Sequence, residues 1–462
     1  MTHFDPTWES LHQYCVPDWF RDAKFGIFIH WGIYSVPAVF DEWYPRRMYL
    51  KDTAVYEYHR ETFGEDFGYK DFIPQFKAEK FDPAAWAKLF HEAGARYVVP
   101  VAEHHDGFPM YASSLTRWNA ASMGPKRDVI SELTDAFRKE GLTAGLSSHR
   151  AEHWWFMNGG KEFPSDVQDS AYAEFYGPAV PSPESNSSEW NHNDWTPRPD
   201  AAYLEDWLAR CCELVDRFHP QLIYFDWWIH QLAFKPTLLK FAAYYYNHVP
   251  DGVINYKLDA FEKGTAVFDI ERGYETQSQP EPWQTCTSVS KISWGYINHH
   301  VYKEPTAIIH HLADIVSKNG CLLLNVGPRP DGTFPDEEQK ILREIGHWLS
   351  VNGEAIYGTR PWRVYGEGPT EIPAGQFSDN DVAFTGQDIR FTTKGERLFA
   401  ITLGDPGAVV MIKSFTKEQV LVVKLLGSDE DLSWSMEEAG LKINVPEKGN
   451  GKHAWVFEIL KK

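Results

Sequence analysis

Short apolar runs that alternate with amphipathic helical stretches constrain the fold of this chain more than any other feature. The helical stretches lie at 83–93, 128–140, 201–218, 236–248 and 307–318. Strands that are buried on both faces and separated by helices form parallel sheets. About seven such units over ~350 residues therefore predict an irregular (β/α)8-type TIM barrel. The apolar runs lie at 25–29, 97–101, 143–146, 222–225, 252–255, 266–270 and 321–325.

The pattern changes after a last helical stretch at 336–350. Short alternating runs between turns follow, which is typical of a small all-β sandwich. We expect a catalytic barrel at 1–358 and a C-terminal β-sandwich at 359–462, since a 462-residue chain exceeds the usual size of one domain. The β runs lie at 390–393, 397–402, 409–412, 420–423 and 455–459.

Residues 150–200 interrupt the alternation with a long stretch rich in Trp, Pro and Ser. Long loops in compact domains are often functional. In a barrel this loop would follow the third strand, so we expect it to overhang the mouth. It could also form an interface in a homo-oligomer.

The formal net charge of −20 limits the kinds of partner. An acidic surface repels phosphate backbones and anionic headgroups, so we expect neither nucleic acid nor a membrane as partner, and a neutral substrate fits better. The 19 Trp, 22 Tyr and 29 Phe suit either sugar binding or a densely packed aromatic core.

The N-terminus and the cysteines predict a cytoplasmic protein. Residues 1–6 lack the basic and apolar regions of a signal peptide, and no apolar run approaches the ~20 residues that span a bilayer. The five cysteines have no spacing that suggests zinc or a disulfide framework. We expect reduced thiols, no metal and no cofactor.

Polar residues follow the predicted strands at the point where each strand ends. The C-terminal ends of barrel strands face the active site, so these side chains are expected to converge there. Each one alone could merely cap a strand, but the whole set predicts a functional site. It comprises His30, Trp31, Glu103 to Asp106, Ser148 to Arg150, Asp226 to Trp228, Asn255 to Lys257, Asp269, Glu271, Arg272 and Asn325.

Two of these residues form a candidate catalytic pair. Asp226 follows four apolar residues and precedes two Trp, and Glu271 ends a second strand. Most glycosidases use two carboxyl groups, one as nucleophile or base and one as proton donor.

A series of motifs resembles the α-L-fucosidases of glycoside hydrolase family 29. The motifs run in family order through residues 1–360, and together they are far more specific than any one alone. They are Phe25 to Gly32, Glu42 to Tyr44, His104 to Phe108, Tyr224 to Asp226, Ser293 to Tyr296 and Leu324 to Pro328.

The resemblance implies a retaining exo-glycosidase that acts on terminal α-L-fucosides. Asp226 would be the nucleophile that forms a covalent fucosyl-enzyme. Trp294 would pack on the apolar face of the sugar near its methyl group. The positions that match those holding the fucose hydroxyls are His30, Glu42, Trp43, His104 and His105.

Some positions depart from the family pattern. Many members place the acid/base shortly before a Lys-Trp-Glu stretch, which here reads Pro282-Trp283-Gln284. The candidates are then Asp269, Glu271, Glu275 and Glu281. We favour Glu271, because it closes a strand and Arg272 beside it could orient a carboxylate or a substrate hydroxyl; Asp269 is the main rival.

Two sugar-binding positions also differ. The family's arginine after the fifth strand is Lys257, which cannot make the same bidentate contact. The family's tyrosine after the third strand is Ser148, and we take the adjacent His149 as a substrate-binding candidate.

Three alternatives stay open at this stage. Residues 149–153 spell H-x-x-E-H, the pattern of a class of zinc peptidases, which requires a helix and a third ligand. A catalytically inactive fucose-binding protein could keep the same scaffold, although Asp226 argues against it. A galactosidase could keep the mechanism and change the sugar.

Overall fold

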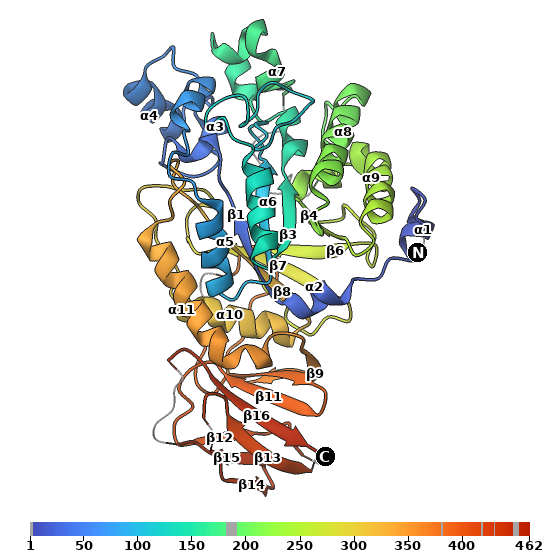
Figure 1. The fold of residues 1–462 in the computed structure, drawn as a ribbon, viewed down its shortest axis with the longest axis vertical. Helices are drawn as coiled ribbons and strands as arrows, with labels where there is room; N and C mark the ends of the chain where they lie inside the picture. The colour runs from blue at the N-terminus through green and yellow to red at the C-terminus, as the bar shows by residue number, and fades with distance from the viewer. Residues whose placement is uncertain (1–2, 182–191, 380–381, 417–418, 429, 447–451) are drawn as a thin grey trace.

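Eight parallel strands form a closed barrel in the computed structural model, which describes residues 3–181, 192–379, 382–416, 419–428, 430–446 and 452–462 (Figure 1). The strands pair in chain order and β8 closes on β1, which confirms the predicted barrel. Their bounds are β1 Phe25–Ile29, β2 Tyr97–Glu103, β3 Thr143–Ser148, β4 Leu222–Phe225, β5 Val253–Tyr256, β6 Val267–Glu271, β7 Trp283–Ser288 and β8 Gly320–Val326.

One barrel strand, β7, was not predicted from the sequence. The strand reads Trp-Gln-Thr-Cys-Thr-Ser, so it lacks the apolar run that marked the other seven. Its polar side chains are nevertheless buried and bonded inside the barrel. Gln284 donates to Asp269 Oδ1 at 2.8 Å and accepts from the Tyr97 hydroxyl at 2.9 Å.

The predicted helices form the outer layer of the barrel, with ends within three residues of expectation. Asp82 and Asp200 cap α5 and α8 by accepting backbone N–H groups of the first turn. The predicted helices are α5 Pro83–Glu92, α6 Val129–Lys139, α8 Ala201–Phe218, α9 Lys235–His248, α10 Pro305–Ser317 and α11 Asp336–Asn352. The described residues also form α1 Trp8–Leu11, α2 Asp18–Ala23, α3 Tyr44–Arg47, α4 Ala54–Phe63 and α7 Ala173–Tyr176.

The C-terminal part forms two antiparallel sheets with a separate apolar core, as expected for the β-sandwich. The five predicted strands are present, and three others were missed. The strands at 360–367 and 434–437 are half-exposed or exposed without alternation, and the strand at 440–444 alternates over a very short stretch. The first sheet contains β13 Val420–Leu425, β16 Trp455–Lys461, β11 Arg397–Thr402, β10 Ile389–Lys394 and β9 Arg360–Glu367, and the second β12 Val409–Ile412, β15 Gly440–Asn444 and β14 Trp434–Glu437.

Helices α10 and α11 lie between the barrel and the C-terminal sheets (Figure 1). A buried ion pair crosses this boundary, since Arg390 of β10 contacts Asp314 of α10 at 2.6 Å. No helix of the described residues is long and apolar enough to cross a membrane.

The loop at 150–200 is buried over most of residues 150–160, and beyond them most of its described residues are half-buried or exposed. It folds into single turns, including the 3-10 helix Arg150–Trp154, and packs Trp154, Trp155 and Phe175 into the barrel core. Figure 1 shows α7, which belongs to this loop, at the end of the barrel away from the C-terminal sheets. Residues 182–191, among them Ser185 to Ser188 and Trp190, lie outside the described residues.

Candidate active site

A cavity of about 570 Å³ lies at the C-terminal ends of the barrel strands. Six consecutive strands, β1 to β6, each place at least one side chain at its wall, either from their last residue or from the residues that follow. All nine residues expected in the site line this cavity: His30, Glu42, Trp43, His104, His105, His149, Asp226, Glu271 and Trp294.

Asp226 sits directly after β4 between a lysine and two histidines. Its Oδ1 accepts from Lys257 Nζ at 2.8 Å, and its Oδ2 lies 3.1 Å from His149 Nδ1 and 3.6 Å from His105 Nε2. Burial alone would raise the pKa of Asp226, but Lys257 and His149 outweigh burial and lower this pKa well below its ordinary value. Asp226 is therefore a carboxylate at neutral pH.

His149 is held in one tautomer by its two partners. Burial outweighs the nearby Asp226 charge and lowers the pKa of His149 to about 4, so the ring is neutral at pH 7. Nδ1–H then donates to Asp226, and Nε2 accepts from the Ser147 hydroxyl at 2.6 Å. His149 thus occupies the wall where the family tyrosine was expected, whereas Ser148 does not line the cavity.

Lys257 joins the two carboxylates. Its Nζ lies 2.8 Å from Asp226 Oδ1 and 2.6 Å from Glu271 Oε2. These two oxygens are therefore at most about 5.4 Å apart, the sum of the two distances. Inverting glycosidases separate their carboxyl groups by ~6.5–9.5 Å and retaining ones by ~5–5.5 Å.

The other acid/base candidates lie outside the cavity. Asp269 points into the barrel, is fully buried, and accepts from Tyr224 at 3.0 Å and Gln284 at 2.8 Å. Burial raises the pKa of Asp269 to about 6 even though Lys257 and these bonds oppose the rise. Glu275 and Glu281 do not line the cavity either.

Arg272 does not orient Glu271 as the sequence suggested. It lies with its guanidinium 4.8 Å from the ring centroid of Trp294 and donates to the Ser290 carbonyl at 3.2 Å. This expectation was wrong because the backbone of Arg272 is left-handed, with φ of +46°, and this turn separates its side chain from that of Glu271.

Two further walls carry polar groups with fixed directions. His30 Nδ1 lies 2.7 Å from Asn325 Oδ1, while the Asn325 amide donates to the Trp294 carbonyl, so Nδ1 is the donor and Nε2 is left as an acceptor. Glu42 Oε2 accepts from the Trp294 N–H at 2.8 Å and the Ser293 hydroxyl at 3.0 Å. Burial raises the pKa of Glu42.

His104 and His105 both line the cavity, with ring centroids 4.2 Å apart. Both neighbouring side chains can reach the cavity because β2 ends at Glu103, so the alternation of side chains along a strand does not apply to them. His104 Nδ1 is buried without a partner among the described residues. His105 Nδ1 contacts Glu152 at 2.6 Å; burial opposes protonation, but Glu152 and Asp226 raise the pKa of His105.

The H-x-x-E-H stretch does not form a peptidase zinc site. It lies on a short 3-10 helix, and His153 Nδ1 bonds to the His105 carbonyl at 2.9 Å instead of facing His149. Two other groups bring ligand atoms within 4.8 Å of one another, His30 with His104 and His149, and His105 with His149 and Asp226. Neither group contains His153.

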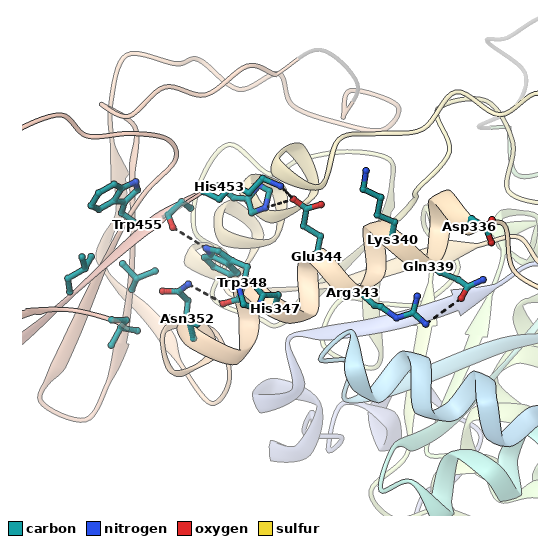
Figure 2. A pocket seen from close by; sticks show the side chains of 16 residues that line it. Asp336, Gln339, Lys340, Arg343, Glu344, His347, Trp348, Asn352, His453 and Trp455 are labelled. Carbon is teal, nitrogen blue, oxygen red and sulfur yellow. Dashed lines mark hydrogen bonds and ion pairs between the residues drawn. The ribbon is translucent and has the colours of Figure 1, made fainter. Parts of the chain in front are cut away.

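A second cavity of about 860 Å³ lies between α11 and the C-terminal sheets (Figure 2). Its central acid, Glu344, is paired with Lys452 and with His453, the latter at 3.0 Å. Apolar side chains of Trp348, Leu425 and Val456 form much of the remaining wall. It lacks the carboxylate pair of the first cavity.

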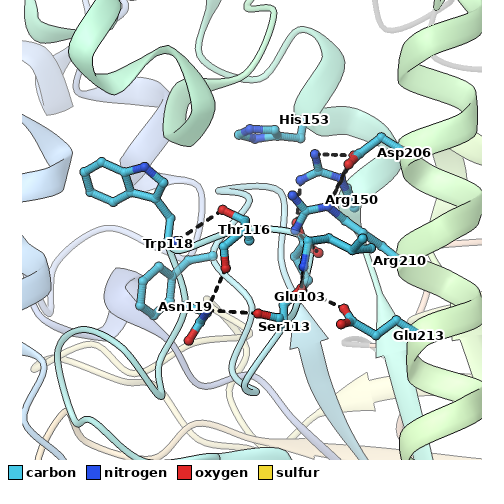
Figure 3. A network of polar contacts seen from close by, with 12 residues as sticks. Glu103, Ser113, Thr116, Trp118, Asn119, Arg150, His153, Asp206, Arg210 and Glu213 are labelled. Carbon is cyan, nitrogen blue, oxygen red and sulfur yellow. Dashed lines mark hydrogen bonds and ion pairs between the residues drawn. The ribbon is translucent and has the colours of Figure 1, made fainter.

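A network of ion pairs joins the end of β2 and the turn after β3 to helix α8 (Figure 3). Arg150 contacts Glu103 at 2.6 Å and Asp206 at 2.6 Å, and Arg210 contacts Asp206 at 3.2 Å. These residues do not line the first cavity. Glu103 and Arg150 were in the strand-end set, so the structure separates them from the site.

Sequence reasoning missed several residues of the cavity wall. Arg47, Leu258, Gln376 and Phe377 carry no motif, and the last two belong to the segment between β9 and β10. No strand-end pattern could place them, because only the packing of that segment on the barrel brings them to the cavity.

Comparisons with known proteins agree with this geometry. The sequence model described as alpha-L-fucosidase matches residues 1–354, and that of the alpha-L-fucosidase C-terminal domain matches residues 380–460. Tissue alpha-L-fucosidase of Rattus norvegicus is 32% identical, covering 99% of this chain and 93% of its own length, and that of Homo sapiens is 32% identical, covering 96% and 88%.

Solved structures give the same result. The structure of Thermotoga maritima alpha-fucosidase in complex with fucose superposes with a TM-score of 0.80 at 32% identity, covering 99% of this chain and 100% of that one. The same protein in complex with a mechanism-based inhibitor matches equally well. The barrel, the cavity at its strand ends and these full-length matches show that the chain is a glycoside hydrolase and belongs to the α-L-fucosidase family, glycoside hydrolase family 29.

Proposed function

We propose that the protein hydrolyses terminal α-L-fucosides with retention of configuration through a covalent fucosyl-enzyme. The observation that carries this proposal is the pair of carboxylates, Asp226 and Glu271, held by the same Lys257 ammonium at no more than about 5.4 Å. One ammonium that holds both carboxylates keeps them close together, which suits direct attack by one carboxylate on the anomeric carbon.

Asp226 is the proposed nucleophile. Its lowered pKa keeps it ionised, and its hydrogen bonds with Lys257 and His149 fix the direction of both oxygens. Attack on the anomeric carbon forms a glycosyl ester, which a water then cleaves in the second step.

Glu271 is the proposed acid/base, because of the four candidates it is the one that lines the cavity. Glu271 must donate a proton to the leaving oxygen in the first step, and then accept a proton from the attacking water in the second. In the free protein it accepts from Lys257, so we expect Lys257 to keep Asp226 and release Glu271 when the substrate enters.

The remaining walls suit a neutral deoxy-sugar. His30 Nε2, the His104 ring and the carboxyl of Glu42 supply directional hydrogen bonds for hydroxyls. The indole face of Trp294, supported from one side by Arg272, offers an apolar surface for the methyl group.

The direct test is hydrolysis of an aryl α-L-fucoside, followed by proton NMR of the first sugar released. We expect α-L-fucose before mutarotation. An aryl α-L-galactoside, which carries a hydroxyl where fucose has its methyl hydrogen, should react far more slowly. β-L-Fucose as the first product would overturn the retaining mechanism, and a folded protein without turnover would favour the inactive sugar-binding alternative.

A further inference from the structure

A segment of the C-terminal part, residues 375–379, lies against the barrel next to Glu271. Gly375 forms a two-way backbone bridge with Tyr274. The Phe377 N–H then donates to the Glu271 carbonyl at 2.9 Å, and the Ser378 N–H donates to the Arg272 carbonyl at 2.7 Å. The segment therefore continues the barrel wall directly beyond β6.

The far end of this segment is anchored in the barrel as well. The buried Asp379 accepts from the Thr287 hydroxyl and from Lys303 Nζ, and its N–H donates to the Arg272 carbonyl at 3.0 Å. With backbone bonds at one end and a buried ion pair at the other, the segment holds Phe377 in a fixed position.

Phe377 has two features that packing does not explain. Phe377 is 64% exposed although it lines the cavity, and its backbone is left-handed, with φ of +57°. A left-handed conformation is strained for a residue with a Cβ, and exposing a large apolar ring to water is unfavourable as well. Such strain at a cavity mouth indicates a binding role.

Trp227 supplies a second aromatic surface in the same cavity. It directly follows Asp226, is half-buried, and is supported by Trp195 at 5.8 Å and Trp155 at 6.4 Å between ring centroids. The sugar-binding walls of His30, His104 and Trp294 come from other strand ends. Two aromatics therefore border the part of the cavity next to both carboxylates.

The position of Phe377 relative to Glu271 indicates which part of a substrate it meets. A proton donor lies beside the leaving oxygen, and Phe377 is bonded through its backbone to the residue proposed as that donor. We propose that Phe377, together with Trp227, forms the subsite for the sugar to which fucose is attached, a neutral hexopyranose whose C–H face packs on the Phe377 ring. This inference rests on the proposed function.

The test compares two fucosyl substrates that differ only in their leaving group. An α-L-fucosyl hexose disaccharide fills this subsite, whereas α-L-fucosyl fluoride releases only fluoride and leaves it empty. For Phe377→Ala we expect kcat/KM on the disaccharide to fall about tenfold, the size of one lost aromatic contact, and kcat/KM on the fluoride to stay within about twofold. Phe377→Tyr should restore the disaccharide rate.

Two further variants make the comparison specific. Leu421→Ala removes an apolar side chain that is 47% exposed on β13, away from the cavity, and should change neither rate. Phe377→Gly removes the ring and accepts the left-handed backbone without strain, so it should fold at least as well as the wild type and show the same selective loss.

An equal loss on both substrates, or no loss on either, would overturn the subsite. Failure of the wild type to hydrolyse either substrate would instead overturn the proposed function, so the two failures are distinguishable.

Discussion

The molecule has two separate groups of buried charged residues, those of the catalytic cavity and those of the ion-pair network in Figure 3. The same turn after β3 serves both, since His149 and Glu152 contact cavity residues while Arg150 contacts the network. In the network Glu103 and Asp206 each face arginines, and burial does not prevent them from raising the pKa of Arg150.

The cavity is organised differently. One lysine pairs with two carboxylates, and His104 Nδ1 has no hydrogen-bond partner among the described residues. His30 bonds to Asn325 through Nδ1, and Glu42 bonds to Trp294 through Oε2, so each keeps a second atom that can accept a hydrogen bond. Buried polar groups cost free energy unless they are paired. In the network Arg150 and Arg210 each have carboxylate partners, which stabilises the fold, whereas the cavity keeps acceptors on His30 and Glu42 that a substrate can use.

Replacement of Asp226 should separate the two regions most strongly. We expect Asp226→Gly to lower kcat on an aryl α-L-fucoside by on the order of 10⁴-fold or more, because the nucleophile is lost. Lys257 keeps Glu271 as its partner, so the unfolding midpoint should change little. Added azide should restore part of the turnover and give the β-fucosyl azide. Turnover like that of the wild type would remove Asp226 from its role.

Replacement of Arg150 should have the opposite signature. Arg150→Met leaves Glu103 buried with only Arg210, at 3.6 Å, nearby, so we expect a loss of about 3–5 kcal/mol in the free energy of unfolding. The kcat of the folded fraction should be unchanged. Urea titration measures the first quantity and active-site titration the second.

A matched control for Arg150 is Arg343→Met. Arg343 is more than half exposed and lies 3.7 Å from Glu92, so its loss should cost less than about 1 kcal/mol. Equal destabilisation by the two variants would contradict the distinction between buried and exposed pairs.

The sequence predicted the barrel and most of the site because both depend on local patterns. Seven strands carry apolar runs, and the residues after them converge by the geometry of any parallel barrel. Strand β7 and the exposed strand β14 were missed because burial of polar side chains, or exposure of a strand, erases that pattern.

Contacts between distant segments could not be predicted in the same way. Lys257 was expected only as a weaker substitute for an arginine, yet it joins Asp226 to Glu271. Phe377 lies 106 positions from Glu271 in the sequence and bonds to its carbonyl only through the docking of the C-terminal part on the barrel. Such contacts depend on tertiary packing, which no local pattern encodes.

Glu271 and Asp269 lie on the same strand, β6, but Glu271 lines the cavity and Asp269 is buried in the barrel interior, so replacing each one separates a catalytic from a structural role. For Glu271→Ala we expect kcat on a fucosyl disaccharide to fall about 10²-fold, and much less on an activated aryl fucoside, whose leaving group needs little protonation. Asp269→Asn keeps the buried volume and should alter both rates equally, through stability alone. If Asp269→Asn shows the leaving-group dependence instead, the acid/base assignment is wrong.

The smallest effect we expect concerns the pH profile. Lys257 lowers the pKa of Asp226 against the effect of burial, and the acidic limb of kcat/KM reports that ionisation in the free enzyme. In Lys257→Met the carboxylate loses its cation and faces Glu271 unshielded, so the pKa of Asp226 rises and the acidic limb moves to higher pH. Lys257→Arg keeps the positive charge and should leave the limb near its wild-type position.

Arg210→Met removes a cation from the network, where it pairs with Asp206 and not with Asp226, so it should lower stability and leave the limb unmoved. A limb that moves with Arg210 as much as with Lys257 would show that the two regions share one electrostatic field and are not distinct.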